Sequence, residues 1–195
     1  FDPHVMRVSP AWSASIFSTI LEEKSTDSTP RARHPKTPQI PLQNQPIQIQ
    51  RAEMNRTDIE ALIPHRDPFL WIDEVVEIGD GKIHARKKIE DELDVFRGHY
   101  PHFPILPGVL QLEAAFQAGA ILIAKTQEVG EGQVPVVTRV NNTKFRTMVR
   151  PGDTLDIEVE LTETLSNAFF LTGKVSVDGK VTVRLEFACA AAKVE

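Results

Sequence analysis

The residues best suited to chemistry lie in one run, residues 97–117. A histidine, His99, stands in a loop that also contains Pro101, Pro104 and Pro107. Each proline fixes its own φ and biases the residue before it away from helix, so the loop can hold the imidazole in a fixed orientation. An imidazole held in this way is suited to general-base catalysis.

A helix is predicted to begin directly after this loop. Pro107 suits a first helical turn, where the backbone amides have no partner inside the helix. Because such an N-terminus attracts developing negative charge, the amide of Gly108 could polarise a carbonyl oxygen. Glu113 lies inside the same helix, with Gln117 one turn later on the same face. Among apolar neighbours the Glu113 carboxyl is expected to be desolvated, which favours its protonated form and the role of general acid.

These residues alone leave two interpretations open. In the first, the base, the carbonyl-polarising amide and the acid form a catalytic site. In the second, His99 is a loop histidine, Glu113 is a paired helix carboxylate, and the prolines only stiffen the chain. A neighbouring histidine, His102, is a second candidate base.

The segments around the run predict an antiparallel sheet with one long helix. Periodicity indicates a helix over residues 109–127 and strands at residues 70–78, 82–90, 134–149, 154–164, 169–177 and 180–190. Asp80-Gly81 and Asp178-Gly179 are signals for two-residue hairpin turns. Apolar and polar residues alternate from Leu155 and again from Val181, so one face of the sheet is buried. The α+β class is therefore favoured, with the sheet curled around the helix.

Composition divides the chain near Met54. The first 53 residues hold half of the 14 prolines and none of the 10 glycines. We therefore expect residues 1–53 to be a disordered or linker-like extension and residues 54–195 to form a single domain. A helix-start signal, Thr57-Asp58, follows Met54 closely.

Charge and cysteine content exclude several classes of protein. A formal net charge of −5 argues against general nucleic-acid binding, which needs a basic surface. The single cysteine, Cys189, excludes an intramolecular disulfide, and its alternation with Leu185 and Phe187 predicts a small buried side chain. No stretch reaches the roughly 20 apolar residues that span a bilayer, and no cluster has zinc-ligand spacing. We expect a cytoplasmic protein without a metal.

The chemical run resembles the active-site segment of the β-hydroxyacyl-acyl carrier protein dehydratases of fatty-acid synthesis. The family pattern reads approximately G-H-F-P-x-x-P-(I/L)-x-P-G-V-L-x-x-E-A-x-A-Q. It stands here as Gly98-His99-Tyr100-Pro101, Pro104-Ile105, Pro107-Gly108-Val109-Leu110, Glu113-Ala114 and Gln117. Residues 63–70 resemble the family's entry motif L-P-H-R-x-P-F-L, and residues 145–153 its F-x-x-x-V-x-P-G-D segment. The resemblance covers about residues 56–190.

Three positions depart from the family pattern. Tyr100 replaces the usual Phe, His102 stands where Gly is common, and Phe116 replaces a small residue. The last two crowd the loop and the helix, so they bear on chain-length preference and loop mobility more than on the reaction. His99, rather than His102, aligns with the family's histidine.

The resemblance implies a hot-dog fold and a lyase that needs no cofactor. The implied reaction dehydrates a (3R)-hydroxyacyl group on the phosphopantetheine arm of acyl carrier protein, with His99 as base, Glu113 as acid and the Gly108 amide on the carbonyl. It also implies a homodimer, often within a trimer of dimers, in which His99 of one subunit meets Glu113 of the other. Two alternatives stay open: a hot-dog acyl thioesterase, and a non-catalytic protein that binds acyl groups or the carrier.

Further residues are candidates for binding. The substrate-pocket candidates are Tyr100, Phe103, Leu106, Val109, Phe116 and Gln117. A basic stretch with no acidic residue could steer an acidic carrier protein, although a solvated strand face also explains it; its members are Arg139, Lys144, Arg146 and Arg150. His65 and Arg66, from the entry motif, are expected to brace their loop, and His84 to be solvated.

Overall fold

The computed structural model describes residues 53–193. The N-terminal extension expected at residues 1–53 lies outside the described residues, apart from Glu53. Within the described part, no helix is long and apolar enough to cross a membrane.

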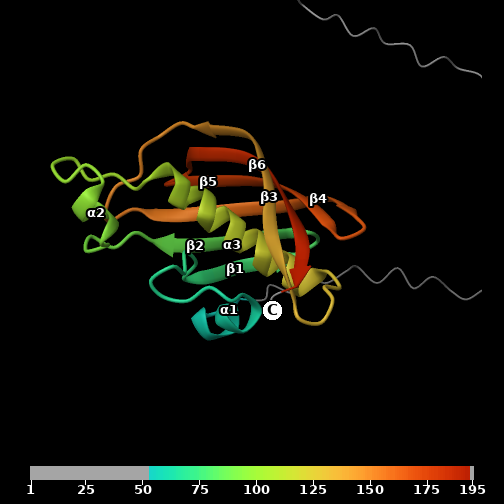
Figure 1. Ribbon diagram of the computed structural model, residues 1–195. Helices are drawn as coiled ribbons and strands as arrows, with labels where there is room; N and C mark the ends of the chain where they lie inside the picture. Colours follow the sequence, from blue (N-terminus) through green and yellow to red (C-terminus); the bar gives the residue numbers. More distant parts are fainter. Residues whose placement is uncertain (1–52, 194–195) are drawn as a thin grey trace, which may run out of the picture. The chain divides into compact units, whose positions relative to one another are not determined.

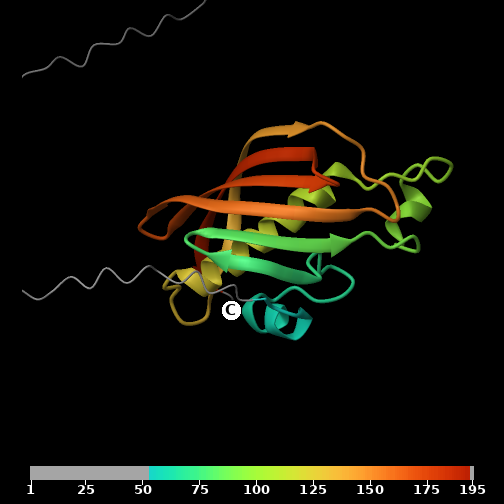
Figure 2. The same ribbon diagram turned by 180° about the vertical axis from the view of Figure 1, so that it is seen from behind.

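Six antiparallel strands form one sheet that curls around a long helix (Figures 1 and 2). The helix is α3 (Gly108–Thr126), and the strands in their order across the sheet are β1 (Glu74–Gly79), β2 (Lys82–Lys88), β4 (Thr154–Leu165), β5 (Ala168–Val177), β6 (Lys180–Lys193) and β3 (Gln133–Phe145). This arrangement confirms the predicted α+β class and the hot-dog architecture.

Both predicted hairpin turns are present. Asp80 and Gly81 have φ of 49° and 72° between β1 and β2, and Asp178 and Gly179 have φ of 48° and 75° between β5 and β6. Positive φ at both central residues is the geometry of a type I′ turn, which matches the twist of the flanking strands.

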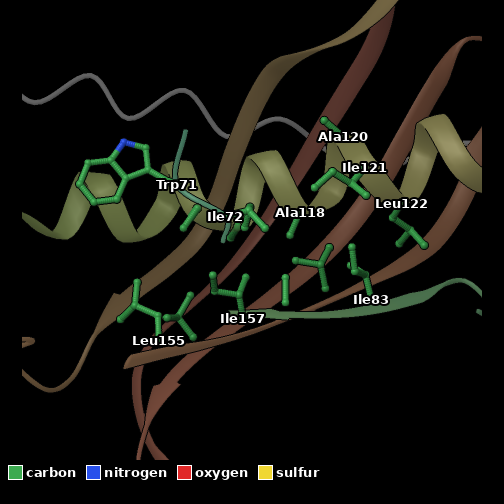
Figure 3. Packing of buried hydrophobic residues seen from close by; sticks show 14 of the residues in the cluster. Trp71, Ile72, Ile83, Ala118, Ala120, Ile121, Leu122, Leu155 and Ile157 are labelled. Carbon is green, nitrogen blue, oxygen red and sulfur yellow. The ribbon is translucent and has the colours of Figure 1, made fainter. Parts of the chain in front are cut away.

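The core lies between α3 and the inner face of the sheet. Figure 3 shows Ala118 and Leu122 of the helix on the side that faces Ile157 and Ile83 of the sheet. In β4 the predicted alternation is confirmed, since Leu155, Ile157 and Val159 are buried while the residues between them face outward. In β6 it is confirmed only in part, because Thr182 and Ala188 are buried as well. Cys189 is also buried, and burial raises the pKa of its thiol to about 12.

Glycine lets the helix approach the sheet closely. A Cβ on Gly119 of α3 would lie 2.8 Å from Cζ of Phe187 on β6. Real Cβ atoms do not come so near to other heavy atoms, so this position favours a residue without a side chain.

Two strand ends differ clearly from the sequence prediction. The strand predicted at residues 70–78 begins only at Glu74, because the amide of Trp71 donates to the Gln117 side chain instead of to a neighbouring strand. The strand predicted to reach residue 149 ends at Phe145. The first helix, α1 (Arg56–Leu62), is capped by Asn55, and Asp58 completes a capping box with it.

Two further features differ from the sequence prediction. A one-turn helix, α2 (Val95–Gly98), directly precedes His99 and has no counterpart among the predicted elements. The prediction of a solvated His84 is wrong, because its Nε2 lies 2.8 Å from Oδ1 of Asp156 on the adjacent strand and its side chain is only 30% exposed.

Candidate active site

The loop after α2 fixes the orientation of His99. Its backbone N–H caps α2 by donating to the Val95 carbonyl, and its Nδ1 lies 2.8 Å from the carbonyl oxygen of Ile105. A carbonyl oxygen can only accept, so Nδ1 carries the proton. In the neutral imidazole Nε2 is therefore bare, which is the tautomer that a general base needs.

The loop itself is tied to the segment that precedes β4. The amide of Leu106 donates to the carbonyl of Val149, and the Arg150 guanidinium lies 4.5 Å from the centroid of the Phe103 ring. Tyr100 has a φ of 53°, which is unusual for an aromatic residue and costs conformational energy. These contacts hold the loop that carries His99 against the segment before β4.

Gly108 is the first residue of α3 and borders a cavity of about 390 Å³. Pro107 is the N-cap rather than a residue of the first turn. A Cβ on Gly108 would lie 2.6 Å from Cε1 of Phe145, so the ring covers the glycine closely. The cavity is lined by Ile105, Leu106, Gly108, Val109, Gln111, Phe145, Arg146, Thr147 and Met148. An oxygen in this cavity would meet the unpaired amides of a helix N-terminus.

Gln117 organises the surroundings of Glu113. Its Oε1 accepts from the amide of Trp71 at 2.8 Å, and its Nε2 donates at 2.9 Å to both the Phe69 carbonyl and Oε1 of Glu113. An amide N–H can only donate and a carbonyl can only accept, so the orientation of the Gln117 carboxamide is determined. The Glu113 side chain is 21% exposed, and Nε2 of His65 lies 3.6 Å from its Oε1.

His99 and Glu113 have different neighbours. His99 contacts Ile105 and Tyr100, whereas Glu113 contacts Gln117 and His65. Among residues 53–193 no hydrogen bond or ion pair joins the two. His99 does not line the cavity beside Gly108, although Ile105, whose carbonyl it contacts, does.

The binding candidates are divided between the cavity, the surface and the core. Leu106 and Val109 line the cavity beside Gly108. Tyr100 and Phe103 are 61% and 46% exposed, while Phe116 packs edge-on against Phe187 in the core. The carrier candidates are all exposed, and in the described part of the chain none makes an ion pair; they are Arg139, Lys144, Arg146 and Arg150.

Sequence reasoning missed several residues of the site. Gln111, Phe145 and Met148 line the cavity, but they come from the helix face, the end of β3 and the loop after it. The entry motif indicates only a loop-bracing role for His65, although its ring reaches Glu113. The motifs include Phe145 and His65 but do not indicate what their side chains contact, because the fold brings distant segments together.

Comparisons with known proteins identify a family and similar relatives. Residues 63–186 match the FabA-like domain family. The chain is similar to 3-hydroxyacyl-[acyl-carrier-protein] dehydratase FabZ of Clostridium perfringens strain SM101, with 39% identity over 128 residues that cover 66% of this chain and 91% of the relative. It is also similar to the protein of the same name from Erythrobacter litoralis, with 42% identity over 142 residues that cover 70% of this chain and 93% of the relative.

Solved structures share the fold. The dehydratase heterocomplex ApeI:P from Xenorhabdus doucetiae matches with a TM-score of 0.57 and 17% identity, covering 69% of this chain and 91% of that one. The protein smu.793 from Streptococcus mutans, solved with acetyl CoA, matches with a TM-score of 0.52 and 14% identity, covering 67% of this chain and 96% of that one. At such identities the likeness concerns the fold alone.

Proposed function

This chain belongs to the FabA-like family, and on that premise we propose that it dehydrates (3R)-hydroxyacyl groups on acyl carrier protein to trans-2-enoyl groups, as in fatty-acid synthesis. The observation that carries the proposal is the bond from Nδ1 of His99 to the Ile105 carbonyl. It leaves Nε2 bare, so a neutral His99 can take a proton from the α-carbon of the substrate.

Each of the three groups has one role in the proposed reaction. Nε2 of His99 removes the α-proton, while the Gly108 amide stabilises the negative charge that develops on the thioester oxygen. Glu113 gives its proton to the β-hydroxyl, which leaves as water while the Cα–Cβ double bond forms. The substrate's own carbonyl accepts the electrons, so the elimination as written uses no cofactor.

We further propose that each active site is shared by two copies of the chain, with His99 of one subunit near Glu113 of the partner subunit. Within one described chain these residues contact different groups. Among residues 53–193 the edge strand β3 pairs only with β6, and it exposes Val136, Val140 and Phe145. The opposite edge strand, β1, is partly covered by the Met54–Val75 bridge. An unpaired apolar edge is a place where two sheets join, and such dimers can assemble further into a trimer of dimers.

Mixing two inactive variants tests the shared site. His99→Ala and Glu113→Gln copies each lack one group, but a mixed dimer contains one intact pair. If subunits exchange at random, about half of the dimers are mixed and roughly a quarter of the wild-type activity returns. No recovery after denaturing and refolding the two variants together would contradict the shared site.

The exposed basic residues along β3 and the loop after it are our proposed docking site for the carrier protein. Arg139, Lys144, Arg146 and Arg150 have no acidic partner within residues 53–193, so their charge is available to an acidic partner. Arg146 also lines the cavity beside Gly108, which links this surface to the proposed reaction centre. The catalytic unit is proposed to be residues 54–195, acting in the cytoplasm.

Hydration of a short trans-2-enoyl thioester, the reverse reaction, tests the function through loss of the conjugated absorbance. We expect His99→Ala and Glu113→Gln to lower kcat by roughly 10²- to 10⁴-fold, the usual contribution of a general acid or base. His102→Ala is the matched control, since it removes a neighbouring exposed histidine. An inactive wild type, or a His99→Ala variant near the wild-type rate, would refute the proposal. Release of free thiol from the thioester without hydration of its double bond would indicate a thioesterase.

A further inference from the structure

The ring of His65 lies against the proposed catalytic acid. Nε2 of His65 is 3.6 Å from Oε1 of Glu113, and the two side chains are 29% and 21% exposed. The ring also stacks on Phe69 with centroids 6.3 Å apart and an interplanar angle of 25°. Arg66 holds the loop below it by donating to the carbonyls of Glu60, Ile63 and His65. His65 is thus held by its surroundings while one edge of its ring faces Glu113.

The surroundings of His65 select one of its two neutral tautomers. Nδ1 is buried and has no hydrogen-bond partner among the described residues. A proton on Nδ1 would therefore be a buried donor without an acceptor, and the lone pair of Nε2 would face a carboxyl oxygen. A proton on Nε2 points instead toward Oε1 of Glu113. The second tautomer is the favourable one.

The Gln117 carboxamide determines which oxygen of Glu113 accepts hydrogen bonds. Gln117 Nε2 donates to Oε1, so Oε1 already accepts one hydrogen bond. A second donor, His65 Nε2–H, faces the same oxygen. When Glu113 is a carboxylic acid, its proton must then lie on Oε2, because Oε1 is directed at two donors.

We propose that His65 is a positioning residue for Glu113: together with Gln117 it fixes Oε1, so that Oε2 carries the proton and delivers it to the substrate. The inference rests on the proposed function, since Glu113 is the acid only if the dehydration is correct. The present 3.6 Å separation exceeds a hydrogen bond, and such contacts tighten when substrate binds. His65 acts through Glu113 and does not line the cavity beside Gly108.

Two substitutions separate positioning from packing. His65→Phe keeps an aromatic ring against Phe69 but removes the Nε2 donor. His65→Gln loses the ring but places an amide N–H at about the reach of Nε2. If His65 positions Glu113, His65→Phe lowers kcat roughly 10- to 100-fold with little change in KM, as expected for a misplaced catalytic group. His65→Gln then retains most of the wild-type kcat.

If His65 only packs against its neighbours, the His65→Phe variant stays active and the His65→Gln variant is impaired. That result would overturn the proposal. An equal loss of kcat in both variants would also overturn the proposal. Wild-type hydratase activity tests the function separately, so an inactive wild type counts against the dehydratase assignment and not against the His65 contact.

Nitrogen NMR of histidine-labelled protein tests the contact without any turnover. The chain has 6 histidines, and His65→Phe identifies the signal of His65 by its loss. We expect that signal to show the tautomer protonated on Nε2 and to shift on Glu113→Gln. A signal protonated on Nδ1, or one that Glu113→Gln leaves in place, would overturn the proposal.

Discussion

Gln117→Leu is the substitution whose effect the structure specifies most closely. The side chain is 1% exposed and makes three hydrogen bonds, to the Trp71 amide, the Phe69 carbonyl and Glu113. Leucine fills a similar volume but offers no polar atom. The substitution therefore leaves two backbone groups and one carboxyl oxygen without their partner.

The expected loss of stability depends on whether each group that loses its bond to Gln117 can be hydrated instead. The Trp71 amide is buried, so it bears the full penalty for an unsatisfied donor, about 1–3 kcal/mol. Phe69 is 51% exposed, and its carbonyl can regain part of its hydration. Glu113 is partly exposed, so the loss of its bond to Gln117 adds little to the destabilisation. We expect the free energy of unfolding to fall by about 2–4 kcal/mol.

Gln111→Leu is the matched control, because it changes the same residue type in the same helix at 3% exposure. Oε1 of Gln111 is buried without a partner among the described residues, so the substitution removes an unsatisfied atom rather than a bond. Its effect on stability should be near zero or favourable. Urea unfolding at one protein concentration measures both variants. Equal losses in the two would refute the hydrogen-bond reasoning and would indicate that burial alone decides the cost.

Three further predictions concern other parts of the fold. Burial opposes ionisation of Asp156, but bonds from Arg86 and His84 outweigh it and hold the Asp156 pKa below its usual 3.8. The resulting stability is present at neutral pH and is lost as the pH falls below 3.8, so Asp156→Asn should shift the urea midpoint at pH 7 and not in strong acid. Cys189 should resist a thiol reagent at pH 8 until the protein unfolds, since burial raises its pKa to about 12; rapid labelling of the folded protein would contradict this. Removal of residues 1–53 should leave turnover unchanged, and loss of activity would show that the extension contributes to the enzyme.

Local signals in the sequence predict the parts of the fold that depend on neighbouring residues. Asp80-Gly81 forms its turn because both residues accept positive φ, and the alternation from Leu155 follows the pleat of a strand. The strand prediction for residues 70–73 is wrong, because their apolar composition suits either a strand or a buried loop. What decides between them is a side chain from α3, 46 residues away from Trp71.

The difference between local signals and contacts made by distant segments also explains how much of the site could be predicted from the sequence. His99 and Gly108 lie in one run, and the prolines and the helix-start position indicate their chemistry from the sequence alone. Phe145 reaches Gly108 only because β3 lies at the sheet edge beside the start of α3, and His65 reaches Glu113 across 48 residues of chain. Such contacts depend on topology, which periodicity does not determine.

The geometry of α3 itself favours an active site built from two chains. Glu113 comes five positions after Gly108. On an α-helix this places the two residues roughly 7.5 Å apart along the axis and about 140° apart around it. The amide at the helix start points along the axis toward the N-terminus, whereas the Glu113 side chain leaves the helix sideways more than one turn later, which favours the proposed sharing of the site between two copies. A second copy joined along β3 would supply its own α3 with an independent orientation. The hydrogen bonds to Gln117 then serve the partner's site as well as the local fold, so Gln117→Leu should lower activity in the same protein whose stability it reduces.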